Sequence, residues 1–230
     1  MPDPLFDRQI LRVVVGSRAH GLSHAESDTD RRGVFLPTAD AHWSLAGVPE
    51  TVRDDPGEAL AWELGRFLRL LLSSDPNALE VLFTPLLEYA TPLGGELLAL
   101  RPAVLSRTLH ETCGGYAEQQ FARFRRRVAA GKPFKWAHAA HCLRLLATGA
   151  RALAGDGFPV TVGGRHRDVL LKVKRGEMTL EEVDTVRLRW HEGLDLALRS
   201  GPLPAGPDRA AVDAFLIHAR RRAADSEDLP

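Results

Sequence analysis

Two aspartates and an arginine near the N-terminus have the types and spacing that metal-assisted phosphate chemistry uses. Asp28, Asp30 and Arg32 follow one another at intervals of two, and residues i and i+2 of a β-strand lie on one face. Two neighbouring carboxylates repel each other, and burying them without compensation is costly. A divalent cation removes both problems. Hard oxygen ligands suit Mg²⁺, which completes its shell with water and substrate phosphates, so the pair predicts a Mg²⁺ site.

A turn of small residues lies ten residues upstream of this pair. The apolar run from Leu11 to Val15 ends at Gly16-Ser17. After a strand, such a turn presents backbone N–H groups with no side chain in the way, and the serine hydroxyl adds a donor, so a phosphate can bind there. A solvated edge strand with scattered charges is the plainer interpretation of the aspartates. It does not explain why the Gly-Ser turn stands at a short distance from them.

Composition and charge describe an ordinary globular chain with an uneven charge distribution. The 230 residues are 44% hydrophobic and 26% charged, with no net charge. Residues 1–100 carry 8 Lys+Arg against 15 Asp+Glu, whereas residues 101–151 carry 10 against 2. An acidic part followed by a basic part suggests two surfaces with different partners. A solvated helix face is the alternative explanation for the basic part.

The sequence argues against membrane insertion, secretion and a disulfide framework. No apolar run reaches the roughly 18 residues of a membrane helix, and the first residues, MPDPLFDRQ, lack the features of a signal peptide. Cys113 and Cys142 cannot build a disulfide framework and lack the paired spacing of a zinc site. We therefore expect a cytoplasmic protein.

Hydrophobic periodicity predicts a small α/β region followed by helices. The expected strands cover residues 11–15, 28–36 and 58–62. The expected helices cover residues 64–72, 78–83, 103–130, 134–154, 179–200 and 208–224. We expect two domains, residues 1–100 and residues 101–230.

These patterns resemble a known superfamily. An apolar residue with Gly16-Ser17, ten residues and then Asp28-Thr29-Asp30 is similar to the signature of the DNA polymerase β-type nucleotidyltransferases. The fuller run GSRAHGLSHAESDTDRRGVF resembles the branch associated with RNA ligases and RNA repair. The runs WELGRFLRLLLSSDPNALEVLF and, more weakly, KWAHAAHCLRLL are similar to later blocks of that branch. The resemblance implies an α+β fold, with a minimal α/β catalytic domain built on a small mixed sheet and a helical domain that closes the cleft.

The resemblance also implies a reaction. A Mg²⁺-dependent nucleotidyltransferase moves a nucleoside monophosphate from a nucleoside triphosphate to a hydroxyl and releases pyrophosphate. Asp28, Asp30 and a third carboxylate would hold two Mg²⁺ or Mn²⁺ ions. The superfamily places the third carboxylate at the start of the strand before the apolar helix, and the resemblance therefore predicts Glu58 for this role; Asp55 and Glu63 are the rivals.

The nucleotide-binding residues predicted beside them carry N–H groups, hydroxyls or positive charge: Gly16, Ser17, Arg18, Arg32, Lys135, His141 and Arg144. The last three belong, with His138, to a row of residues spaced by three, which turns gradually around the expected helix. The alternative is that His138 and His141 are satisfied residues of a packing interface. The run FARFRRR could bind a phosphate backbone, or be a solvated face.

We expect the acceptor to be an RNA end. A protein hydroxyl or a small molecule stays open as the acceptor. A protein that modifies a partner, and a non-catalytic nucleotide sensor or antitoxin-like protein, are the alternative functions.

Overall fold

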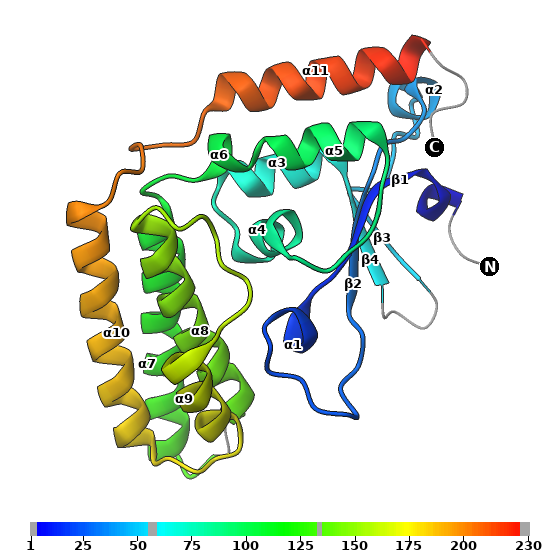
Figure 1. Ribbon diagram of the computed structural model, residues 1–230. Helices are drawn as coiled ribbons and strands as arrows, with labels where there is room; N and C mark the ends of the chain where they lie inside the picture. The colour runs from blue at the N-terminus through cyan, green and yellow to red at the C-terminus, as the bar shows by residue number, and fades with distance from the viewer. Residues whose placement is uncertain (1–3, 55–58, 133–134, 226–230) are drawn as a thin grey trace. The chain divides into compact units, whose positions relative to one another are not determined.

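The computed structural model of the chain describes residues 4–54, 59–132 and 135–225 (Figure 1). The chain forms two compact units. The sheet unit comprises residues 1–19, 23–104 and 207–230, and the helical unit comprises residues 20–22 and 105–206. Among the described residues, no helix has the length and apolar character needed to cross a membrane.

The sheet unit contains a mixed sheet of five strands in the order β3-β4-β2-β1-β5. Strands β2 and β4 are parallel, and the other neighbouring strands are antiparallel. The strands are β1 (Gln9–Val14), β2 (Arg31–Phe35), β3 (Thr51–Arg53), β4 (Ala59–Glu63) and β5 (Leu87–Ala90). The predicted α+β class with a small mixed sheet is confirmed.

Helices pack on this sheet through apolar stripes and begin at capping residues. In α3 (Leu64–Leu72) the side chains of Leu64, Phe67 and Leu71 are fully buried. Asp75 caps α4 (Pro76–Phe83) by accepting from two backbone N–H groups. The remaining helices of this unit are η1 (Pro4–Arg8), α1 (Gly16–Ala19), α2 (Ala39–Trp43), α5 (Pro92–Ala99), α6 (Arg101–Val104) and α11 (Arg209–Asp225), which packs against α2, α3 and α6 (Figure 1).

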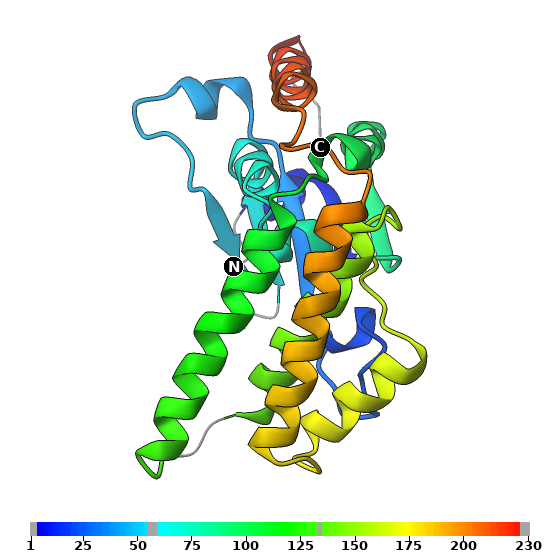
Figure 2. The ribbon, with the colours of Figure 1, turned by 90° about the vertical axis from the view of Figure 1, so that its left-hand side faces the viewer.

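The helical unit is built around α8 (Trp136–Leu153), whose residues 142–149 are all buried. Its other helices are the π-helix η2 (Glu111–Gly115), α7 (Tyr116–Ala129), α9 (Gly164–Lys174) and α10 (Leu180–Ser200). Helices α7, α9 and α10 all pack against α8 (Figure 2). Burial raises the pKa of both thiols, Cys113 and Cys142, to about 12.

The sequence pattern placed several elements imperfectly. The strand expected over residues 28–36 begins only at Arg31, and the helix expected over residues 103–130 is divided among α6, η2 and α7. Strands β3 and β5 and helix α9 were not expected. Strand β3 has three residues, β5 has three exposed residues out of four, and α9 is mostly exposed, so none shows a clear apolar period.

Candidate active site

The Gly-Ser turn follows β1 and begins the short helix α1. Gly16 has φ of +72°, a left-handed conformation that other residues rarely adopt. Its N–H donates a hydrogen bond to Oε1 of Glu80 at 2.7 Å. Glu80 lies on α4 and is only 6% exposed. Because a buried carboxylate needs strong donors, this bond fixes the turn and α4 together.

Glu80 is a site residue that the sequence analysis missed. Its one signal in the sequence is a charge inside the otherwise apolar run ALEVLF. A second bond links the same two elements, since the Thr84 hydroxyl at the end of α4 donates to the Val14 carbonyl at 2.9 Å. Hydrogen bonds from α4 therefore help to fix the conformation of the turn.

Asp30 lies directly against the turn. Its carbonyl accepts from the Val15 N–H at 2.9 Å, which continues the β1–β2 pairing one step beyond the strand ends. A Cβ atom on Gly16 would stand 2.5 Å from Oδ2 of Asp30, which is far closer than unbonded atoms approach. Glycine is therefore required at this position both by its φ angle and by the Asp30 carboxylate. The structure brings together the predicted phosphate turn and one predicted metal ligand.

Asp28 follows a turn at residues 25 and 26, and Arg18 holds the backbone there. The Arg18 guanidinium donates to the carbonyls of Ser27 at 2.6 Å and of Asp28 at 3.2 Å. The Ser27 hydroxyl in turn accepts from the His24 N–H at 2.9 Å. Asp28 is exposed, and Asp30 is half-buried. Arg18 was expected to contact phosphate; the structure places its guanidinium on the loop that carries Asp28.

The residues between the two halves of the motif are anchored within the helical unit. Residues 20–22 belong to that unit. Their carbonyls accept, in order, from the Val162 N–H at 3.1 Å, from Nε of Arg167 at 2.8 Å and from Nζ of Lys174 at 3.1 Å. Three of the ten residues between the two halves of the motif, residues 20–22, therefore make backbone hydrogen bonds within the helical unit.

Arg32 lies within β2, opposite Val13 of β1. It is half-buried, and its guanidinium donates to the carbonyl of the preceding residue at 2.7 Å. Arg31 lies on the other face of the strand, where Nε is 3.0 Å from a carboxylate oxygen of Glu88 on β5. The two adjacent arginines therefore have different environments, and only Arg32 shares the face predicted for the aspartates.

The register of β2 and β4 separates the candidates for the third carboxylate. Glu58 and Asp55 lie outside the described residues. Ala59 stands beside Arg31 at the start of the two parallel strands, whereas Glu63 stands beside Phe35 at their other end. Four residues of strand correspond to about 13 Å. Glu63 is therefore far from Asp30, and its carboxylate instead caps α3 by accepting from the Arg66 N–H at 2.8 Å.

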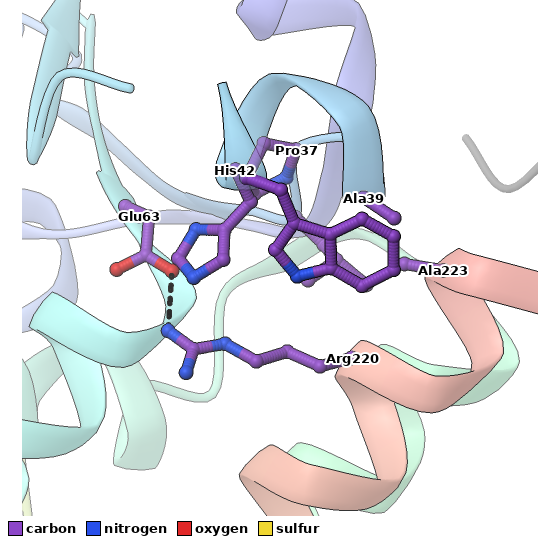
Figure 3. A pocket seen from close by; sticks show the side chains of 8 residues that line it. Pro37, Ala39, His42, Glu63, Arg220 and Ala223 are labelled. Atoms are coloured by element: carbon purple, nitrogen blue, oxygen red, sulfur yellow. Dashed lines mark ion pairs between the residues drawn. The ribbon is translucent and has the colours of Figure 1, made fainter. Parts of the chain in front are cut away.

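Glu63 borders a pocket at that far end, shown in Figure 3. The pocket encloses about 270 Å³, including space open to solvent, and Trp43 on its border is 71% exposed. Oε1 of Glu63 lies 3.9 Å from a guanidinium nitrogen of Arg220 (Figure 3). None of the predicted metal or nucleotide ligands in the described part of the chain lines this pocket, so it is separate from the candidate active site.

The three predicted residues of the helical unit have unequal exposure. Lys135 precedes α8 and is exposed, His141 is half-buried, and Arg144 is only 2% exposed. A guanidinium nitrogen of Arg144 lies 3.3 Å from Nδ1 of His141. The His141 ring meets Tyr116 edge to face at 5.8 Å, and burial raises the pKa of the Tyr116 hydroxyl. The row of residues thus runs from solvent into the packed interior of its own unit.

A mixed sheet that places a Gly-Ser turn against an aspartate of an Asp-x-Asp pair defines the class of polymerase β-type nucleotidyltransferases. The family model described as RlaP, the RNA repair pathway DNA polymerase beta family, matches residues 7–218. The chain belongs to this family. The predicted resemblance is confirmed. Comparison with curated proteins gives no match.

Proposed function

We propose that this chain is a Mg²⁺-dependent nucleotidyltransferase that acts on the end of an RNA strand. It transfers a nucleoside monophosphate from a nucleoside triphosphate to a hydroxyl and releases pyrophosphate. The observation that carries this proposal is the contact of the Asp30 carboxylate with Gly16, because it sets a metal ligand beside a phosphate-binding turn. Membership of an RNA repair family supports the same reaction.

The carboxylates present fit a hard divalent cation. Asp28 is exposed and Asp30 half-buried, so both offer oxygen ligands that water and substrate can reach. We assign the third carboxylate to Glu58. The residue that follows it, Ala59, pairs with Arg31 across the two parallel strands, and Arg31 directly follows Asp30 in the chain. When bound, the two ions would neutralise the triphosphate and lower the pKa of the attacking hydroxyl.

The protein's own residues position the substrate. Because the Gly16 N–H is engaged by Glu80, Ser17 is the donor of the turn that we assign to the triphosphate. Arg18 keeps the Asp28 loop in place before the substrate binds, and such preorganisation lowers the barrier. The hydroxyl oxygen forms a bond to the α-phosphorus while the bond to the β-phosphate oxygen breaks. The hydroxyl proton passes to solvent, and pyrophosphate leaves.

The positively charged residues predicted beside this site complete the proposal. We assign Arg32, Lys135, His141 and Arg144 to the binding of the triphosphate. Arg144 would act through His141, which its guanidinium contacts, since Arg144 itself is buried.

The basic part of the chain supports an RNA acceptor. Residues 101–151 carry 10 Lys+Arg against 2 Asp+Glu. Helix α7 exposes Arg123, Arg125, Arg126 and Arg127. Exposed arginines on one helix can neutralise several phosphates of a nucleic-acid backbone.

Transfer of labelled nucleotide tests the proposal. The protein is incubated with each α-labelled triphosphate, Mg²⁺ and RNA that ends in a free 3′-hydroxyl, and with the same RNA carrying a 3′-phosphate. Label on the first RNA alone is the expected result. Label on protein would instead identify a protein-modifying enzyme. Triphosphate binding without transfer of label would identify a nucleotide sensor. Either of these two results overturns the proposed acceptor chemistry.

A further inference from the structure

A second group of metal-ligating side chains lies within the helical unit. His110, His191 and Asp195 each bring one donor atom to within 4.8 Å of the others. His191 and Asp195 are one turn apart on α10, and His110 immediately precedes η2. Nε2 of His110 is 2.6 Å from Oδ1 of Asp195, and Nε2 of His191 is 3.8 Å from the same oxygen.

We propose that His110, His191 and Asp195 form a binding site for a Zn²⁺-class divalent ion. Two imidazoles and one carboxylate are the protein ligands of an open tetrahedral zinc site, in which a fourth position is left for water or another ligand. Imidazole nitrogen favours zinc and related transition metals over Mg²⁺. This site is therefore chemically different from the all-carboxylate site of Asp28 and Asp30.

The two distances of His191 suit coordination better than hydrogen bonding. The 2.6 Å between Nε2 of His110 and Oδ1 of Asp195 is a hydrogen-bond length, and it must open by about 0.7 Å to fit two ligands of one ion. Two ligands of a tetrahedral zinc ion stand about 3.3 Å apart, given bonds of about 2.0–2.1 Å. Nε2 of His191 lies 3.8 Å from Asp195 and 3.9 Å from Oε1 of Glu118 on α7. Both separations exceed hydrogen-bond length, yet each needs to close by only about half an ångström to match two ligands of one ion. Glu118 is 62% exposed and can serve as the fourth ligand.

The backbone around His191 is shaped to hold its ring. Gly114 lies in the π-helical turn, and a Cβ atom there would stand 3.1 Å from Cε1 of His191. π-Helical turns occur frequently at functional sites. Nδ1 of His191 is buried and has no hydrogen-bond partner among the described residues, so the position of the ring does not come from a hydrogen bond on that side. It follows from the tight packing against Gly114.

The same orphaned nitrogen sets the expected strength of binding. Zinc-binding histidines usually donate their second N–H to an acceptor, and loss of such a partner costs about 10–100-fold in affinity. We therefore expect an ion that chelators remove readily. It would link α10 to the segment before α7 and so stabilise the helical unit.

Cobalt binding tests this site. Chelator-treated protein that carries Asp28→Asn and Asp30→Asn, which disables the carboxylate site, is titrated with Co²⁺ and then with Zn²⁺. We expect one Co²⁺ per chain with the visible absorption of a tetrahedral site, and its displacement by Zn²⁺. His191→Ala and Asp195→Asn, each added to that protein, should weaken Co²⁺ binding at least about 100-fold. For the third ligand, His110→Gln replaces the imidazole with a side chain of similar size, and it should weaken binding in the same way.

His218→Ala is the matched control, because His218 also faces a carboxylate, Glu96 at 3.2 Å, but is not part of the group of three. Binding should be unchanged in this control. Circular dichroism shows whether each variant is folded. Absence of stoichiometric Co²⁺ binding by the folded parent, or equal binding by folded His191→Ala and Asp195→Asn variants, would overturn the proposal. The group would then be a His110–Asp195 hydrogen bond beside an uninvolved His191.

Discussion

Asn in place of Asp30 removes one negative charge from the proposed metal site and changes little else. The two side chains have nearly the same shape, and the backbone bond from Val15 to the Asp30 carbonyl does not depend on the side chain. A unit charge about 4 Å away, at an effective dielectric constant of about 20, interacts by about 4 kcal/mol. Since about 1.4 kcal/mol corresponds to a factor of ten, we expect a loss of about 10²–10³ in the rate of transfer.

The fold should survive this substitution. The carboxylate of Asp30 lies against Gly16, whose N–H is bound to the carboxylate of Glu80. Two negative charges thus flank one glycine, and removal of one relieves repulsion in the metal-free protein. The metal-free variant should therefore melt no lower than the metal-free wild type.

The assay is transfer of label from an α-labelled triphosphate, together with thermal unfolding in the presence of a chelator. Glu26→Gln is the control, because Glu26 is exposed in the same loop and loses the same charge. It should keep its activity. An Asp30→Asn variant that unfolds would show that the aspartate is structural. A folded variant with full activity would show that Asp30 does not bind a metal that the reaction requires.

The structure makes three more predictions. Glu80→Ala should lower the free energy of unfolding by about 1–3 kcal/mol in urea titrations, because it leaves the Gly16 N–H without its acceptor, whereas Glu80→Gln should recover most of this loss. Alanine at both Arg123 and Arg127, exposed on α7, should weaken RNA binding and reduce the slope of log K against log salt by about 1.4; an unchanged slope would exclude this face of the helix. The thiols of Cys113 and Cys142, whose pKa burial raises to about 12 from 9.0, should react with a disulfide reagent at pH 8 only after unfolding. They should also contribute stability that is complete below pH 9 and is lost as the pH rises toward 12, and rapid reaction of the native protein would contradict their burial.

The parts of the site that could be predicted are those set by neighbours in sequence. A strand, a Gly-Ser turn and a returning strand are neighbours in sequence. The closeness of Gly16 and Asp30 can therefore be predicted from their short separation along the chain. The apolar spacing of α3 is likewise readable, because burial of one face is a local rule. The Asp-Pro start of α4 is a local capping signal as well, although the expected helix began only at residue 78.

The rest depends on contacts between residues far apart in the chain. Glu80 and Gly16 are 64 positions apart, and His110 and Asp195 are 85 apart. No local pattern links either pair. The spacing of Arg144 from His141 says which side of α8 it occupies but not what packs on that side. The packing of the neighbouring helices decides that Arg144 is buried.

The loop between the two halves of the motif is more than a spacer. Its centre, residues 20–22, is bound through three backbone carbonyls to residues of the helical unit. Its far side is bound through the carbonyls of Ser27 and Asp28 to Arg18. Four residues, 23–26, lie between these two segments, a length that spans at most about 18 Å when extended. So short a connection leaves residues 23–26 few conformations, and the position of Asp28 depends on Arg18, which holds the carbonyls of Ser27 and Asp28. Preorganisation of the proposed metal ligands thus involves Arg18 as well as the two aspartates.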